Sequence, residues 1–259
     1  MSFPNRIYGD YGDEKVAQST KIGGLPLGTA MELPDGRLFR QAKMSATAGV
    51  AGKVYIETAV VAGHGNVSGS GLICPTAVSV GDESIVLTVG GTGAVTLNQY
   101  AEGTLNMISG TGSGISYKIK SHAAAGTTVA VTINLEDNDS IAATIAAGTT
   151  TAGLRKNLYD EITIRPTGSA QVGPVIGVLP VAASASFYCW LQKTGPASCR
   201  VSATAIVIGQ PVVASTGEAG MITAQVASTT AVIEEQMPIG IAMNVSAASE
   251  HSLVDLTIE

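Results

Sequence analysis

The chain has 259 residues, of which 45% are hydrophobic, 4% aromatic and 13% charged. The charged fraction is about half that of a typical soluble domain, so we expect weakly polar patches that partners cover, unless the plentiful Ser, Thr and Asn residues solvate the surface. With 14 basic and 20 acidic residues the net charge is −6, which argues against nucleic acid as a partner, because phosphate binding needs a basic face.

Residues 1–45 are enriched in aromatic and charged residues relative to the rest of the chain. The opening stretch MSFPNRIYGDYGDEK lacks the apolar run of a signal peptide, so we expect no export by the general secretory route. The first two dozen residues lack sustained periodicity and predict either an extended arm that orders on a neighbouring subunit or a frayed terminus. Farther on, ELPDGRLF predicts a β-hairpin with Asp35 and Gly36 in its turn.

Residues 46–165 are rich in Gly, Thr and Val, and their apolar residues recur with a period of two, the pattern of half-buried strands. This alternation is clear at 85–89, at 115–119 and at 129–135. The runs TLNMI and ISYKIKSH, joined by SGTGSG, predict a hairpin with a flexible glycine-rich tip. The alanine-rich segment 141–148 fits either a short helix or a loop over the sheet.

Residues 166–259 open with a charge-free stretch, but Gly and Pro interrupt it, which excludes a membrane-spanning helix there. Alternation returns at 222–226 and at 254–258. No repeat of fixed period is present, which disfavours a solenoid or propeller. We therefore predict an all-β fold of antiparallel sandwich or barrel-like regions: an N-terminal extended arm and hairpin in 1–45, one β domain in 46–165 and a second in 166–259.

Candidates for chemistry are few. The histidines His64, His122 and His251 have no close spacing, and we expect solvated side chains rather than metal ligands. The acidic run at 136–139 lacks the later ligands of a calcium loop, so a loop that faces water explains it better. Neither a nucleophile elbow nor a Walker-type glycine loop occurs. The sequence predicts no enzyme and no metal or cofactor site.

The cysteines and the single tryptophan favour structural roles. Three cysteines cannot form a closed set of disulfides, and we expect buried free thiols, although Cys189 and Cys199 would also suit the two sides of a hairpin around KTGPAS. Trp190 has bulky neighbours on the same predicted strand, which indicates a core or subunit contact rather than a platform for a sugar.

Five segments together resemble the capsid decoration, or cement, proteins of tailed bacteriophages: GGLPLGTAMELPDGRLFRQAK, TLNMISGTGSGISYKIKSH, FYCWLQKTGPA, VIGQPVVAS and IGIAMNVSAASEHSLVDLTIE. In that family a G-x-PVV segment, an I-G-x-A strand and a final E-x-x-L-V-x-L strand recur in a β domain. The resemblance touches all three regions but a minority of the residues. It implies a non-enzymatic virion protein, made in the host cytoplasm, that binds the major capsid protein on the outside of the head, commonly as a homotrimer, and stabilises the head.

Under this interpretation the hairpin in 1–45 is a candidate for part of the grip on the capsid or on neighbouring subunits. Four apolar side chains would supply contact area and two arginines would reach an acidic capsid surface: Met31, Leu33, Leu38 and Phe39, with Arg37 and Arg40. An ordinary hairpin inside the domain explains the same residues equally well.

Two other classes of function stay open. A head or tail fibre, or a receptor-binding virion protein, shares the β-rich composition, although its usual long repeats or heptad stalk are not visible. A carbohydrate-active enzyme of β fold would need two facing carboxyl groups. The candidates for those groups are Asp35, Glu57, Glu136 and Asp160.

Overall fold

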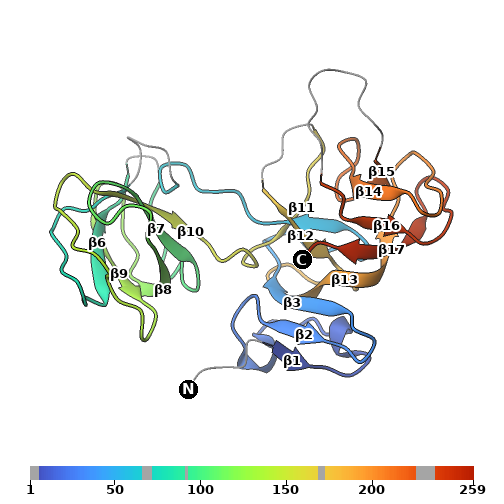
Figure 1. The fold of residues 1–259 in the computed structure, drawn as a ribbon, viewed down its shortest axis with the longest axis horizontal. Coiled ribbons are helices and arrows are strands. Elements are labelled where there is room, and N and C mark those ends of the chain that lie inside the picture. The colour runs from blue at the N-terminus through green and yellow to red at the C-terminus, as the bar shows by residue number, and fades with distance from the viewer. Residues whose placement is uncertain (1–5, 66–71, 91–92, 169–172, 226–236) are drawn as a thin grey trace. The chain divides into compact units, whose positions relative to one another are not determined.

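The structure is a computed structural model that describes residues 6–65, 72–90, 93–168, 173–225 and 237–259 (Figure 1). The chain divides into two compact units. Unit 1 comprises Met1–Thr58 and Leu158–Glu259, and unit 2 is the intervening segment Ala59–Asn157. These units differ from the three regions expected from composition, because strands from 1–45 and 166–259 join one sheet. Composition carries no record of that pairing.

Unit 2 is a closed antiparallel barrel, and its strands within the described residues follow the order β10-β5-β6-β9-β8-β7. The bounds are β5 Leu72–Ile73, β6 Ser84–Thr88, β7 Thr104–Ser109, β8 Ser116–His122, β9 Ala130–Leu135 and β10 Thr151–Arg155. The predicted hairpin is confirmed as β7 and β8. The predicted alternation is confirmed for most positions, since the inward side chains fill the barrel: Ile85, Leu87, Tyr117, Ile119, Val131, Ile133 and Leu135. Val129, expected on the inward side, is instead 49% exposed.

The alanine-rich segment 141–148 is a loop and not a helix. Ile141 and Ile145 are fully buried in the barrel core. Ile145 also forms an isolated antiparallel bridge with Val78, in which each backbone N–H donates to the other residue's carbonyl. The loop therefore closes one end of the core, and this tertiary pairing overrides the helix propensity of alanine.

Unit 1 contains a larger sheet, whose main path of strands is β1-β2-β3-β13-β17-β16-β14-β15, with β4, β11 and β12 attached beside β13. The first four bounds are β1 Arg6–Tyr8, β2 Ala30–Glu32, β3 Leu38–Lys43 and β4 Val54–Ile56. The others are β11 Thr163–Ile164, β12 Val175–Val178, β13 Tyr188–Arg200, β14 Pro211–Ala214, β15 Ile222–Ala224, β16 Gly240–Ala242 and β17 His251–Thr257. Strand β1 pairs with β2 in parallel; the other pairings are antiparallel.

Strand β13 is the central element of this sheet, paired with β3 along its first half and with β17 along its second. A register shift between Gln192 and Thr194 marks the point where the partner changes. The segment KTGPAS thus continues one strand, and a hairpin between Cys189 and Cys199 does not form. Both thiols are free and fully buried, as is that of Cys74 in unit 2.

The N-terminal segment packs on its own chain from Arg6 onward, which corrects the expectation of an arm that orders on a neighbour or frays. Strand β1 extends the sheet beside β2. Two short 3-10 helices follow, Asp13–Lys15 and Ile22–Gly24, and Gln18 exchanges backbone hydrogen bonds with Tyr188. Residues 1–5 of the expected arm and Val226 of the predicted strand at 222–226 lie outside the described residues.

Turns of one type recur in pairs in both units. The pairs are marked by isolated bridges, which join 49 to 183, 78 to 145, 95 to 125 and 206 to 246. Three residues after each bridged residue the backbone has positive φ, and its N–H donates to a carbonyl in the segment leading into the partner turn. These residues are Gly52, Gly81, Asn98, Thr128, Gly148, Ser186, Gly209 and Ser249. Their spacing is irregular, so a search for a fixed period does not find them.

Candidate interaction surfaces

The apolar side chains of the predicted capsid grip lie in the core of unit 1. Met31, Leu33 and Phe39 are buried against Trp190, and Leu38 is buried beside them on β3. They attach the β2–β3 hairpin to the sheet, so in the described chain they present no apolar surface to a partner. Asp35 and Gly36 form the predicted turn, with the Gly36 N–H donating to the Leu33 carbonyl at 2.9 Å. Trp190 is confirmed as a core residue.

Arg37 is bound within unit 1 rather than directed to a partner. Its Nε lies 2.7 Å from Asp35 Oδ2, its Nη2 lies 3.9 Å from Glu14 Oε1, and its guanidinium lies over the Phe39 ring at 5.6 Å. Partial desolvation raises the pKa of Asp35, but hydrogen bonds from the Arg37 side chain and backbone outweigh it, so that the pKa is lowered overall.

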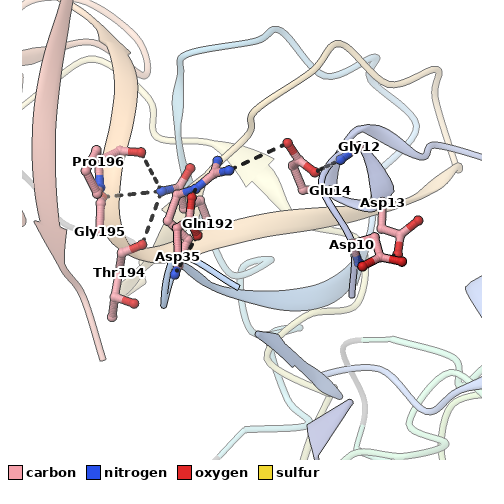
Figure 2. Close-up of polar contacts among 10 residues, drawn as sticks. Asp10, Gly12, Asp13, Glu14, Asp35, Gln192, Thr194, Gly195 and Pro196 are labelled. Carbon is pink, nitrogen blue, oxygen red and sulfur yellow. Dashed lines mark hydrogen bonds and ion pairs between the residues drawn. The ribbon is translucent and has the colours of Figure 1, made fainter. Parts of the chain in front are cut away.

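The same cluster links the hairpin turn to the N-terminal segment, and Figure 2 shows it beside a second polar group on β13. Glu14 is buried and accepts the Gly12 N–H at 2.6 Å. On β13, the Gln192 side-chain amide lies within hydrogen-bond distance of the carbonyls of Thr194, Gly195 and Pro196, which follow the register shift. The ion pairs therefore hold the hairpin turn and the N-terminal segment together, and the Gln192 amide stabilises the irregular stretch of β13.

Arg40 and Lys43, the two basic residues of strand β3, are also paired. Arg40 forms an ion pair with Glu259 and donates to the Gly28 carbonyl at 2.9 Å. The Lys43 amine lies 3.5 Å from Asp160. These pairs leave little uncompensated positive charge for the expected acidic capsid surface, since each guanidinium or amine already faces a carboxylate.

The four carboxylates considered for a glycosidase occupy separate local settings. Asp35 and Asp160 pair with Arg37 and Lys43, while Glu57 is buried directly after β4. Glu136 belongs to unit 2, beside an acidic turn in which Asp137 pairs with Lys120 at 2.5 Å and Asp139 accepts the Lys118 N–H at 2.9 Å. The exposed Asp137 fits the predicted water-facing loop. Among the described residues no group of three His, Cys, Asp or Glu is placed to hold a metal ion.

Two histidines of unit 2 lie in its core, so the expectation of solvated side chains is wrong for them. Tyr100 lies between them: its hydroxyl is 2.6 Å from His64 Nδ1, and its backbone N–H donates to His122 Nε2 at 2.9 Å. The remaining ring nitrogens face carbonyls, His64 Nε2 that of Gly93 at 3.0 Å and His122 Nδ1 that of Ala123 at 2.9 Å. Because a carbonyl can only accept, His64 Nε2 and His122 Nδ1 are the donors to these carbonyls, and every ring nitrogen has a hydrogen-bond partner. Tyr100 and the two histidines form a buried hydrogen-bonded network.

Unit 2 also has a shallow surface cavity of about 280 Å³, just below the roughly 300–1,000 Å³ of common ligand sites. Its lining mixes hydroxyl, amide and guanidinium groups with apolar ones: Val60, Gly65, Thr104, Asn106, Ser116, Gly153, Leu154 and Arg155. Its size gives little support for a small-molecule site.

An exposed apolar face lies on unit 1, over β16, β17 and the turns that flank β14. It is formed by six large side chains that are each 42% to 66% exposed. We call it the β16 face, and its members are Val207, Ile208, Ile241, Met243, Val245 and Leu253. The sequence did not reveal it, because apolar residues occupy both alternating sets along IGIAMNV and the pattern does not say which set faces inward.

Two exposed tyrosines give the N-terminal segment a second surface of its own. Tyr8 at the end of β1 is 82% exposed, and Tyr11 after it is 64% exposed. Tyrosine is enriched at protein interfaces because it offers a large apolar ring and a hydroxyl. These residues are better placed for a partner than the buried hairpin residues.

Comparisons with protein-family models, with curated proteins and with solved structures found no match. No helix in the described residues is both long and apolar enough to cross a membrane. The candidate surfaces therefore rest on the chain's own geometry.

Proposed function

We propose that this chain is a structural, non-catalytic virion protein that binds the outside of a tailed-phage capsid as a homo-oligomer and stabilises the assembled head. The observation that carries the proposal is the β16 face, a continuous apolar patch on a chain with few charges. Large exposed apolar patches are typical of surfaces that partners cover. A protein that remains in an assembly can keep such a patch, because its partners cover it.

The resemblance to cement proteins supports the same function. Two of the short motifs behind it, PVVA in β14 and GIA in β16, lie on neighbouring strands, and β16 pairs in turn with the final strand β17. The motifs thus belong to one piece of sheet, which also bears the β16 face. A role as a homotrimer on the major capsid protein follows from the resemblance.

For the capsid contact, the exposed Tyr8 and Tyr11 replace the hairpin residues as the best candidates. They lie in the N-terminal segment, for which the sequence predicted an arm. The segment therefore stays a candidate for the capsid contact, although it packs on its own chain. Deleting residues 1–20 would be a poor test, since it also removes β1 and the buried Glu14. Replacing both tyrosines by serine keeps the backbone pairing and removes the exposed rings.

The function is tested by purifying particles from a lysate that produces this chain and counting its copies per major capsid protein by quantitative mass spectrometry. Hundreds of copies per particle support the cement role. A handful would indicate a fibre or receptor-binding protein, and absence from particles would refute a virion role.

The capsid contact is tested by adding the protein back to heads stripped of it. We expect the Tyr8→Ser, Tyr11→Ser double variant to bind at least tenfold more weakly than the wild type, with unchanged circular dichroism. A Tyr188→Ser variant, altered on β13 instead, serves as the control. Undiminished binding by the double variant would exclude the two tyrosines from the grip.

A further inference from the structure

The β16 face is built by a regular register. Ile241 of β16 lies opposite Asp255 of β17, so Met243 lies opposite Leu253, as the hydrogen bond from the Met243 N–H to the Leu253 carbonyl at 2.8 Å confirms. Gly240 and Ala242 point inward and are buried, and the odd-numbered residues from Ile241 point outward. The outward side chains therefore form rows across neighbouring strands.

The other side of the face follows from the pairing with β14. Pro211 lies opposite Ile241, and the isolated bridge between Ile206 and Ser246 keeps the same register, which places Val207 opposite Val245. Ile208 adds its side chain from the adjoining turn. The apolar side chains span about 14 Å along β16 and its flanking turn, with Leu253 as the one apolar member from β17, which is the size of the centre of a subunit interface and not of a whole one.

The barrel of unit 2 shows what an ordinary outer face looks like in the same chain. The outward positions of β8 and β9 carry Ser116, Lys118 and Lys120, and Thr132 and Asn134. An antiparallel sheet with one face in water normally has this polar set outside. The β16 face departs from that pattern along β16 and the adjoining turns, although β17 itself keeps the polar His251, Asp255 and Thr257 outside. The apolar run along β16 indicates a covering partner.

Polar side chains of β17 occupy the two ends of the face, in line with its outer rows. Asp255 lies at the Ile241 end, on β17. At the other end of β17, His251 lies beside Arg200 of β13. The nearby Glu250 carboxylate, which accepts the Ala247 N–H at 3.1 Å, adds a negative charge at that end. The face thus has the Asp255 carboxylate at one end, an apolar middle, and the His251 imidazole with Arg200 and Glu250 as neighbours at the other end.

We propose that a second copy of this chain docks on the β16 face, with the same face of both copies in contact about a two-fold axis. With the axis along the middle row, Met243 and Leu253 meet their own counterparts and Ile241 meets Val245 of the copy. The same rotation brings Asp255 over His251 of the copy, where the imidazole N–H and the neighbouring Arg200 can bind the carboxylate. An uncharged centre also limits repulsion between two chains of net charge −6.

This inference rests on the homo-oligomeric part of the proposed function but replaces the homotrimer that the resemblance implies with a two-fold contact, and it is measurable without capsids. Because Met243 lies on the axis, a Met243→Cys variant should form an intermolecular disulfide on mild oxidation. The native thiols are buried and do not compete. The matched control is Val129→Cys, at an exposed apolar position of the barrel, where no dimeric cross-link is expected.

The second experiment compares native masses in solution. The wild type should be dimeric or a higher even-numbered oligomer, and Met243→Lys should raise the dissociation constant at least tenfold, while Val129→Lys leaves it unchanged. Circular dichroism and Trp190 fluorescence establish that each variant is folded. Should Met243→Lys unfold the chain, Val245→Thr provides a milder change with the same expected direction.

The charged ends give a third test. Asp255→Lys should weaken self-association, and the double variant Asp255→Lys, His251→Asp should restore it. Three results would overturn the two-fold contact. The wild type could be a monomer, it could be a trimer that dissociates in Met243→Lys, or Val129→Cys could cross-link as much as Met243→Cys. Failure of the protein to bind heads would instead count against the proposed function and leave these results intact.

Discussion

Replacing the buried Ile133 of the barrel by alanine offers a sharp test of the division into two units. The Ile133 side chain is fully buried in the core of unit 2. Removing it deletes apolar contacts and leaves a cavity, which costs about 2–5 kcal/mol for Ile→Ala. With a urea dependence of about 1–3 kcal/mol per molar for a small unit, the midpoint of barrel unfolding should fall by roughly 0.7–5 M, or about 2 M at the middle of both ranges.

The single tryptophan makes the two units separately visible. Trp190 lies in the core of unit 1, so its fluorescence reports unfolding of that unit, whereas far-UV circular dichroism reports the strands of both. We expect Ile133→Ala to shift an early part of the dichroism transition and to leave the fluorescence midpoint in place. Thr132→Ala, on the outward face of the same strand, should change neither by more than about 0.5 kcal/mol.

A joint shift of both signals in Ile133→Ala would refute the reasoning, since it would mean that the units unfold as one cooperative body. A loss below about 1 kcal/mol would likewise contradict the tight barrel core.

Three further changes have expected outcomes. Tyr100→Phe should destabilise the barrel by about 1–3 kcal/mol in urea unfolding, because it leaves Nδ1 of buried His64 without its hydrogen-bond partner. An unchanged free energy of unfolding would contradict a stabilising role for this hydrogen bond. Thr128→Gly should stabilise the barrel by up to about 1 kcal/mol, since Thr128 holds a φ of +63° that glycine adopts freely, whereas Thr127→Gly should not stabilise it. Burial raises the pKa of Cys199 from 9.0 to about 12. Above pH 9 the thiol loses its proton in the unfolded chain but keeps it in the folded protein. The free energy of unfolding should therefore fall as the pH rises toward 12. Unfolding curves of Cys199→Ala should lack that part of the slope, about 1.4 kcal/mol per pH unit.

Period-two patterns predicted the local structure well for a physical reason. Val131, Ile133 and Leu135 alternate with polar residues, and a strand with one face in a core and one in water needs that arrangement. The β2–β3 and β7–β8 hairpins were equally readable, because their turns need residues such as Gly36 that tolerate a positive φ.

The site was less predictable, because long-range pairing decided which side of each strand is buried. Met31, Leu33 and Phe39 looked like a grip, yet they meet Trp190 from far along the chain. His64 and His122 looked like loop residues, yet Tyr100 lies between them in the barrel core. In the β16 segment both alternating sets are apolar, so only the neighbours could determine which set remained outside.

The sequence by itself determined an all-β chain with few charges, its main strands and its hairpins, since alternation and turn chemistry act over a few residues. Tertiary structure alone decided that residues 59–157 close into a barrel inserted in the chain of a second unit. It also decided that β13 runs on through KTGPAS without turning and that the β16 face is uncovered. These outcomes depend on partners distant in sequence, whose contacts outweigh local preference.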